Sequence, residues 1–189
     1  RPKAPDPPGQ APVALLEKWA GAGGDEALAA LARDYARASL CGAAIGLPGP
    51  TGESNRLAFV PRGTVLCVAG DAQALLNQLA AAWACGNAVA VDPETAPLLP
   101  SDFPQALRDR VRLLGGSGDP ALAPHLALLE GPRASQARMA LAEHEGMIVP
   151  AIETAGRARI PLWRLVAERA LCVNTTAAGG NASLMAMKE

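Results

Sequence analysis

The sequence has 189 residues, of which 17 are Lys or Arg and 18 are Asp or Glu, so the formal net charge is −1. No basic run is long enough to follow a phosphate backbone, which argues against a nucleic-acid-binding module. Half of the residues are hydrophobic, but 41 residues are alanine and only 3% are aromatic, so we expect one core built from small side chains. Because the sequence starts with Arg1, we expect it to begin inside a longer translated chain or after processing.

The first 45 residues predict a linker followed by two helices. Residues 1–12 contain five prolines and cannot hold a helix, so we expect an extended linker. Apolar residues then recur at helical spacing across 13–45, in two runs separated by a glycine-rich break. Asp25 is placed to cap the second helix and Gly42 to end it. Each helix has an apolar stripe that needs a surface to pack against.

From residue 46 to residue 173, short apolar runs alternate with helical ones. Continuous apolar strands that alternate with helices are typical of a parallel sheet covered on both faces. We therefore predict a doubly wound, Rossmann-like α/β domain with a mostly parallel sheet, preceded by two helices and followed by a long strand and a docking tail at 174–189. The expected strands are 56–60, 64–69, 88–91, 111–114, 126–129, 147–152 and 165–173, and the expected helices are 71–86, 105–109 and 132–144.

The cysteines and histidines indicate neither a disulfide framework nor a metal site. The four cysteines have no C-x-x-C spacing and lie among apolar or small residues, which predicts buried thiols in a reducing compartment. They are Cys41, Cys67, Cys85 and Cys172. His125 and His144 are the only histidines, which is too few for a zinc site.

No stretch of the sequence predicts a membrane span or a secretion signal. The longest apolar run is interrupted by Asn77, Gln78 and Asn87, so it falls short of the roughly 18–20 residues that cross a bilayer. There is no signal-peptide pattern. We therefore expect a cytoplasmic protein.

The first strand–helix junction does not match a dinucleotide-binding motif. Such a motif needs G-x-G-x-x-G, because glycines let the pyrophosphate approach the helix N-terminus. Residues 68–73 contain only Gly70, and they place Asp71 where the phosphate would lie. The sequence therefore predicts a Rossmann-like fold that has lost its phosphate site.

The remaining motifs give equally weak evidence for a binding or catalytic site. The glycine-rich junction at 114–119 contains an acid and precedes Pro120, which indicates a plain turn. Residues 46–54 superficially resemble a P-loop, but Glu53 takes the place of the lysine, so we expect a rigid turn that enters a strand. Neither histidine lies near a cysteine in the sequence, and no G-x-S-x-G elbow is present. The densest basic stretch is interpreted as a solvated face of a strand-like segment and consists of Arg157, Arg159, Arg164 and Arg169.

Two motifs resemble the C-terminal region of the proline utilization A family. The first is residues 47–56, followed by the strand at 64–69. The second begins at Glu168 and Arg169 and leads into residues 173–185. The resemblance covers roughly residues 40–185. That family couples a FAD-dependent proline dehydrogenase to an NAD-dependent L-glutamate γ-semialdehyde dehydrogenase in one chain.

The resemblance implies a non-catalytic domain with the fold of the aldehyde dehydrogenase superfamily. It implies FAD and NAD in the parent enzyme and no cofactor in this domain. The implied partner is the aldehyde dehydrogenase module of the same chain, where the tail covers the channel of the reaction intermediate and orders the active site. Small residues let the backbone approach closely enough for strand addition. The expected docking residues are Asn174, Thr175, Thr176, Ala177, Ala178, Gly179, Gly180 and Asn181.

Three alternatives stay open at this point. The chain could be a free-standing nucleotide-binding oxidoreductase with an unorthodox loop. It could be an oligomerisation module that associates with a second copy through an unpaired strand edge. The tail could also be a plain flexible terminus. Peripheral association of the parent enzyme with the inner membrane is left open as well.

Overall fold

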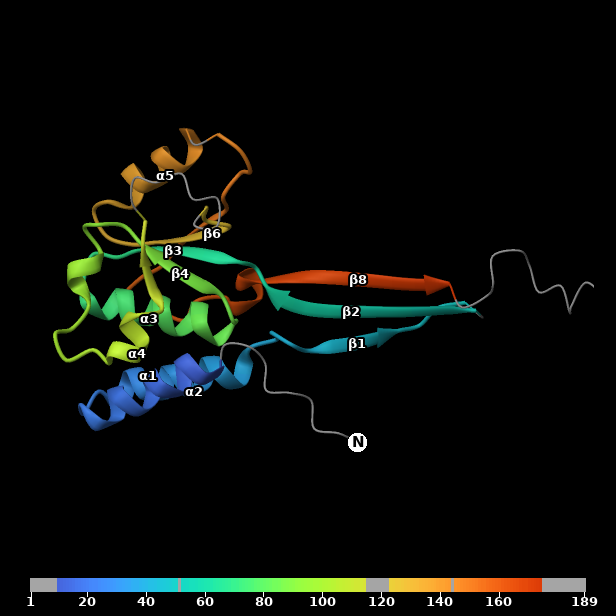
Figure 1. Cartoon of the computed structure of the whole chain (residues 1–189), viewed down its shortest axis with the longest axis horizontal. Coiled ribbons are helices and arrows are strands. Elements are labelled where there is room, and N and C mark those ends of the chain that lie inside the picture. Colours follow the sequence, from blue (N-terminus) through green and yellow to red (C-terminus); the bar gives the residue numbers. More distant parts are fainter. Residues whose placement is uncertain (1–9, 51, 115–122, 144, 175–189) are drawn as a thin grey trace, which may run out of the picture.

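The computed structural model describes residues 10–50, 52–114, 123–143 and 145–174, which form a body and a projecting arm (Figure 1). The body is a five-stranded parallel sheet with helices on both faces. The arm is a separate three-stranded antiparallel sheet that extends away from the helices of the body.

The body sheet has the strand order β5-β4-β3-β6-β7, and every neighbouring pair is parallel. This is the order of a doubly wound Rossmann-like sheet, so the predicted fold class is confirmed. The central strands β3 and β6 are buried along their whole length, which explains their almost unbroken apolar sequences. The bounds are β3 Thr64–Val68, β4 Ala88–Val91, β5 Val111–Leu113, β6 Leu126–Leu129 and β7 Ala151–Glu153.

Helices cover the two faces of this sheet unequally. One face packs against α3, and α1 and α2 lie beyond α3 and share its core. The other face packs against α5, which has no buried residue of its own. The bounds are α1 Gln10–Ala22, α2 Glu26–Ala38, α3 Ala72–Ala84, α4 Gln105–Arg108 and α5 Ala134–Glu143, with 3-10 turns η1 at Ala96–Leu98 and η3 at Leu162–Leu165.

Aspartates begin two of these helices, as predicted. The Asp25 side chain accepts a hydrogen bond from the Leu28 N–H (3.0 Å), and the Asp71 side chain accepts one from the Ala74 N–H (2.9 Å). Helix α1 begins at Gln10, so the linker predicted for residues 1–12 extends three residues too far; Pro12 is tolerated because it lies in the first turn of the helix. Helix α2 ends at Ala38, before the predicted stop at Gly42. The Gly42 N–H instead donates to the Phe59 carbonyl (2.8 Å), so this glycine joins the helical region to the arm.

The arm consists of β1 (Ala44–Leu47), β2 (Glu53–Pro61) and β8 (Val166–Asn174), in the order β1-β2-β8. The long strand predicted near the end of the chain is therefore confirmed. The turn predicted at residues 46–54 does enter a strand, β2, but strand β1 was not predicted: Ala44–Leu47 pairs with β2 as an edge strand. That pairing depends on residues about ten positions away, so local turn chemistry could not reveal it.

Two other predictions fail where apolar residues face solvent. Cys41, Cys67 and Cys85 are buried as expected, but Cys172 is exposed because it lies on β8 in the arm. Strand β7 begins at Ala151, and the expected first part of it, including Met147 and Ile148, is exposed chain outside the sheet.

Asn87 joins the arm to the body. Its side-chain oxygen accepts hydrogen bonds from the backbone N–H groups of Arg62 (2.8 Å) and Gly63 (3.0 Å). Its side-chain nitrogen donates to the carbonyls of Ala82 (3.3 Å) and Leu165 (2.9 Å). The chain leaves β2 at Arg62 and enters β8 just after Leu165, so one buried amide fixes the base of both strands.

A second buried amide, Asn77 of α3, holds the segment that returns from β7 to the arm. Its nitrogen donates to the carbonyls of Gly156 (2.7 Å) and Ala158 (2.9 Å), and its oxygen accepts from the Tyr35 hydroxyl (2.9 Å). That hydroxyl in turn accepts from the Ile160 N–H (2.8 Å). The return segment is therefore bonded along its length to α3 and α2.

Arginines of the same segment form ion pairs with α2 and its cap. Arg157 donates to both carboxylate oxygens of Asp25, one of them at 2.7 Å, and Arg159 pairs with Asp34. The expected strand-like segment is wrong here, since 154–161 is irregular chain, although the Arg159 side chain is 65% exposed. Only Arg169 of the four lies in a strand.

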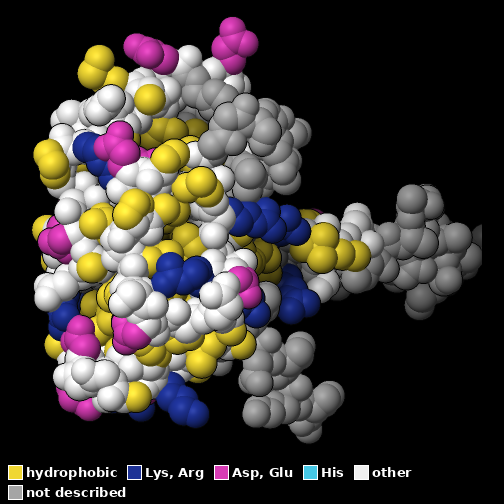
Figure 2. Space-filling model, turned by 60° about the vertical axis from the view of Figure 1, so that its left-hand side comes forward, with side chains coloured by type: hydrophobic (Ala, Val, Ile, Leu, Met, Phe, Trp, Pro, Cys, Tyr) yellow, Lys and Arg dark blue, Asp and Glu magenta, His cyan; other side chains and the backbone are white. Residues whose placement is uncertain are grey.

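The surface of the body mixes charges of both signs on the side shown in Figure 2. None of the helices in the described part of the chain combines the length and apolarity that a membrane span requires. Within the same residues, no group of three or more His, Cys, Asp or Glu side chains is arranged to hold a metal ion.

We expect Asn87→Ala to lower the free energy of unfolding by about 2–3 kcal/mol, because it leaves the N–H groups of Arg62 and Gly63 and the Leu165 carbonyl without a partner. Urea denaturation measures the change. Asn55→Ala is the matched control, since Asn55 makes one 3.5 Å contact with Glu53 on the exposed arm. The control should cost less than about 0.5 kcal/mol, and equal effects of the two substitutions would contradict the role given to Asn87.

Candidate functional site: the switch point and the arm

The first place to look for a ligand is the switch point between β3 and β6. In open α/β sheets, ligands bind in the crevice beyond the carboxyl ends of the two strands whose connections run to opposite faces. Here α3 follows β3 on one face, and α5 follows β6 on the other (Figure 1). The loops that leave these two strands therefore decide whether a dinucleotide can enter.

Those loops meet through two glycines. A Cβ atom placed on Gly131 would lie 2.7 Å from the Gly70 Cα and 3.0 Å from the Gly70 nitrogen. A Cβ atom on Gly70 would lie 3.1 Å from the Gly131 Cα. The two backbones therefore approach each other closely at the place where a Rossmann fold ordinarily holds the pyrophosphate. Gly131 also has a φ of +83°, which favours glycine.

The N-terminus of α3 is already capped. In a dinucleotide site, the free N–H groups at this helix end face the pyrophosphate. Here the Asp71 carboxylate accepts from the Ala74 N–H, as the sequence predicted. A carboxylate at this place repels a phosphate as well as occupying the donor.

Asp92 occupies a third position that contacts the dinucleotide in Rossmann folds, and it was not predicted from the sequence. An acid about 20 residues after the first glycine of a Rossmann motif binds the ribose hydroxyls. Asp92 follows β4 at that spacing from Gly70, so the spacing could have identified it. In this protein, Asp92 pairs with Arg133 and accepts from the Thr95 N–H (2.7 Å).

The environment of Asp92 keeps its carboxylate charged and bonded within the protein. Arg133 also donates to the Thr95 hydroxyl (2.7 Å) and lies 3.3 Å from Glu94. Burial alone raises the pKa of Asp92, but the hydrogen bonds from Thr95 and Arg133 outweigh it, so the pKa lies below its ordinary value. A guanidinium therefore lies at the edge of the sheet where a ribose would bind.

The three buried cysteines and His125 have structural environments. Burial raises the pKa of the Cys85 thiol to about 11, and it also raises the pKa of Cys41 and Cys67. Such thiols stay protonated at neutral pH and are poor nucleophiles. The Nδ1 atom of His125 accepts a hydrogen bond from the Thr64 N–H (3.2 Å), which helps to hold the start of β3. His144 lies outside the described residues.

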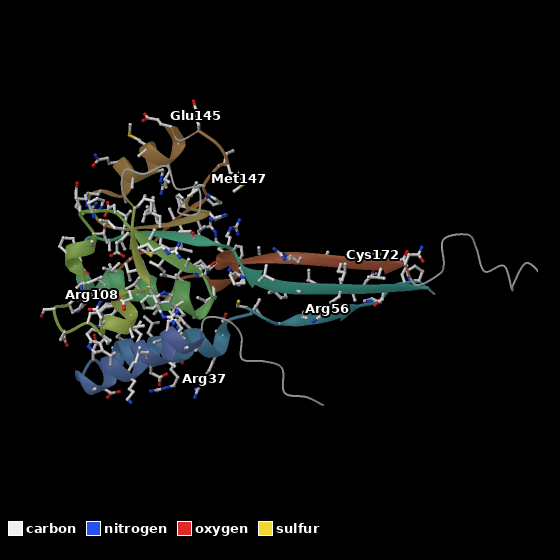
Figure 3. All side chains as sticks on the ribbon, viewed as in Figure 1. Arg37, Arg56, Arg108, Glu145, Met147 and Cys172 are labelled. Atoms are coloured by element: carbon white, nitrogen blue, oxygen red, sulfur yellow. The ribbon has the colours of Figure 1, made fainter. Side chains whose placement is uncertain are left out.

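The predicted docking residues begin at the far end of the arm. Asn174 is the last residue of β8 and is paired with Glu53 of β2. Figure 3 shows the nearby Cys172 at this end, with Arg56 further back along the arm. The remaining predicted docking residues lie outside the described part of the chain and are Thr175, Thr176, Ala177, Ala178, Gly179, Gly180 and Asn181.

Comparison with known proteins identifies a class of fold and a set of homologues. No family model matches the chain. AldH from Staphylococcus aureus has a TM-score of 0.51 and 16% identity, covering 76% of this chain and 40% of that one. A mutant of proline utilization A (PutA) from Bradyrhizobium japonicum has a TM-score of 0.55 and 22% identity, covering 79% of this chain and 20% of that one. These likenesses establish a Rossmann-like α/β fold of the kind that aldehyde dehydrogenases contain.

Sequence similarity then identifies the homologues more narrowly. Bifunctional protein PutA from Escherichia coli (strain K12) is 39% identical over 179 residues, which are 92% of this chain and 13% of that protein. Bifunctional protein PutA from Rhizobium meliloti is 36% identical over 200 residues, which are 97% of this chain and 16% of that protein. The chain is therefore homologous to part of PutA, and it spans about one seventh of the length of these relatives.

We expect Gly131→Ala to destabilise the protein by about 3 kcal/mol, since it combines an unfavourable φ with a clash against the Gly70 backbone. Gly24→Ala is a matched control, because Gly24 has a φ of +81° and no atom within 4 Å of an added Cβ. The control should cost about 1–2 kcal/mol, from the backbone conformation alone. Chemical denaturation of both variants checks the difference, and equal losses would show that the two loops do not touch.

Proposed function

We propose that this chain is one module of a larger bifunctional enzyme that oxidises proline to glutamate. The observation that carries the proposal is 39% identity across 92% of the chain to only 13% of a bifunctional PutA protein. The parent enzyme would carry FAD in its proline dehydrogenase and NAD in its L-glutamate γ-semialdehyde dehydrogenase. Both reactions would occur in the remainder of the parent chain, in the cytoplasm.

Within that enzyme, the module has no catalytic site of its own. Three features of the switch point support this. The Gly70 and Gly131 backbones are in contact, Asp71 caps the helix that would bind phosphate, and Asp92 is paired with Arg133. Each feature occupies a place where the Rossmann fold ordinarily contacts a dinucleotide.

The module instead supports the aldehyde dehydrogenase by docking on it. The arm carries the end of β8 away from the body, so the predicted docking residues 174–181 begin at its far end (Figure 1). The small side chains of this sequence let one backbone approach another closely, as strand addition requires. In this position the segment covers the channel of the intermediate and orders the dehydrogenase site.

We expect truncation of the parent enzyme before Asn174 to lower the aldehyde dehydrogenase rate and the coupled proline-to-glutamate rate by about tenfold or more, because a misplaced active site loses its reactive geometry. Steady-state kinetics of both activities measures the loss. Proline dehydrogenase activity should stay unchanged, since the proposed docking is on the aldehyde dehydrogenase module.

A second truncation, after Asn181, is the matched control. It removes residues 182–189 and keeps the proposed docking residues, so both rates should stay close to those of the full enzyme. Unchanged rates after the longer truncation would contradict the docking role.

A further inference from the structure

The return segment, residues 154–161, forms neither helix nor strand. Ile160 is its only buried residue, and the others are half-buried or exposed. Its backbone is held mainly by side chains of α2 and α3 rather than by a ladder of backbone hydrogen bonds. Segments with few buried apolar contacts are the ones that open locally while the rest of a protein stays folded.

The chain is fixed at both ends of the return segment. Before it, β7 is paired with β6 in the body sheet. After it, Leu165 is fully buried, and its carbonyl accepts a hydrogen bond from Asn87 at the base of the arm. Movement of the return segment would therefore stop at these two points and leave the sheet and the arm in place.

Two ion pairs provide part of the attachment to α2. Arg157 pairs with Asp25 and Arg159 pairs with Asp34, so a cationic segment lies on an anionic side of this helix and its cap. The four side chains are 30–65% exposed. At such exposure, dissolved salt screens the attraction between opposite charges. High ionic strength therefore weakens this attachment, whereas the burial of apolar side chains involves no charge to screen.

A buried amide beside the return segment gives a reason for it to open. Gln78 of α3 is fully buried, and its nitrogen donates to the Val68 carbonyl and to the Thr154 hydroxyl. A carbonyl can only accept, so this contact fixes the nitrogen on that side. The Gln78 oxygen then has no hydrogen-bond donor in the described part of the chain. A buried acceptor without a partner raises the free energy of the closed state, and opening lets water reach it.

We propose that the return segment is a salt-sensitive strap, which opens from α2 and α3 while the sheet stays folded. The open state exposes the Tyr35 hydroxyl and the Asn77 amide, which bind the backbone of the segment in the closed state. Opening therefore changes which polar groups the body presents to solvent. The inference is independent of the proposed function, because every contact that it uses lies within the described residues.

Hydrogen–deuterium exchange of the 189-residue chain, followed by mass spectrometry, measures this opening. The exchange rate of peptides covering 154–161 should rise by at least about fivefold between about 0.05 M and about 1 M sodium chloride, because salt screens both ion pairs. Peptides covering β3 should change by less than about twofold, since that strand is buried along its length. An unstructured peptide in the same buffers corrects for the effect of salt on the exchange chemistry.

Replacing the two arginines tests the charges directly. Arg157→Gln with Arg159→Gln keeps Asp25 as the cap of α2, so the helix is retained while both ion pairs are lost. The return segment should then exchange rapidly at low salt and no faster at high salt. Arg33→Gln is the matched control, because Arg33 pairs with Glu17 of α1. It should leave the exchange of the return segment and its salt response unchanged.

Tyr35→Phe tests an attachment that carries no charge. It keeps the buried ring and removes the hydroxyl that accepts from the Ile160 N–H, so exchange of the return segment should rise by about fivefold or more at both salt concentrations. The inference is wrong if the return segment exchanges at the rate of β3, which would show that it opens only with the whole protein. It is also wrong if salt does not accelerate the exchange, or if the salt response persists when both arginines are replaced.

Discussion

The buried side chain of Asn87 is the contact on which the shape of the molecule depends. It bonds to the backbone just after β2 and to the backbone just before β8, two points about a hundred residues apart in sequence. The end of β2 and the start of β8 are therefore held together at the C-terminal end of α3. The Arg62 guanidinium reinforces this base by donating to the Arg164 carbonyl (3.1 Å). The base of the arm is fixed both by these hydrogen bonds and by the burial of Phe59 and Val166 in the core of the body.

Hydrogen bonds from buried side-chain amides also explain why three polar residues lie in the most apolar part of the sequence. Asn77, Gln78 and Asn87 interrupt the longest apolar run, and all three are buried. Gln78 donates to the Val68 carbonyl (3.1 Å) and to the Thr154 hydroxyl (2.9 Å), which ties the end of β3 to the return segment. Local sequence shows only that polar residues are present. Their partners lie far away in the chain, so their roles become visible only in the folded structure.

The sequence predicted the body much better than the arm or the switch point. Helical periodicity, apolar strands and the caps at Asp25 and Asp71 are local signals, and the structure agrees with them. Strand β1 was missed because four exposed residues form a strand only through their pairing with β2. Gly70 was recognised as a lone glycine, but its contact with Gly131 joins two loops that are sixty residues apart. The pairing of Asp92 with Arg133 was invisible for the same reason.

The Rossmann-like sheet has the topology of a dinucleotide-binding fold, and we propose that its switch point binds no dinucleotide. Gly70 and Gly131 bring the two switch-point loops together, and Asp71 and Asp92 already have partners within the protein. Isothermal titration of the 189-residue chain with NAD and NADP tests this claim most directly. The account predicts no measurable binding of either nucleotide at millimolar concentration, and binding in the micromolar range would contradict it.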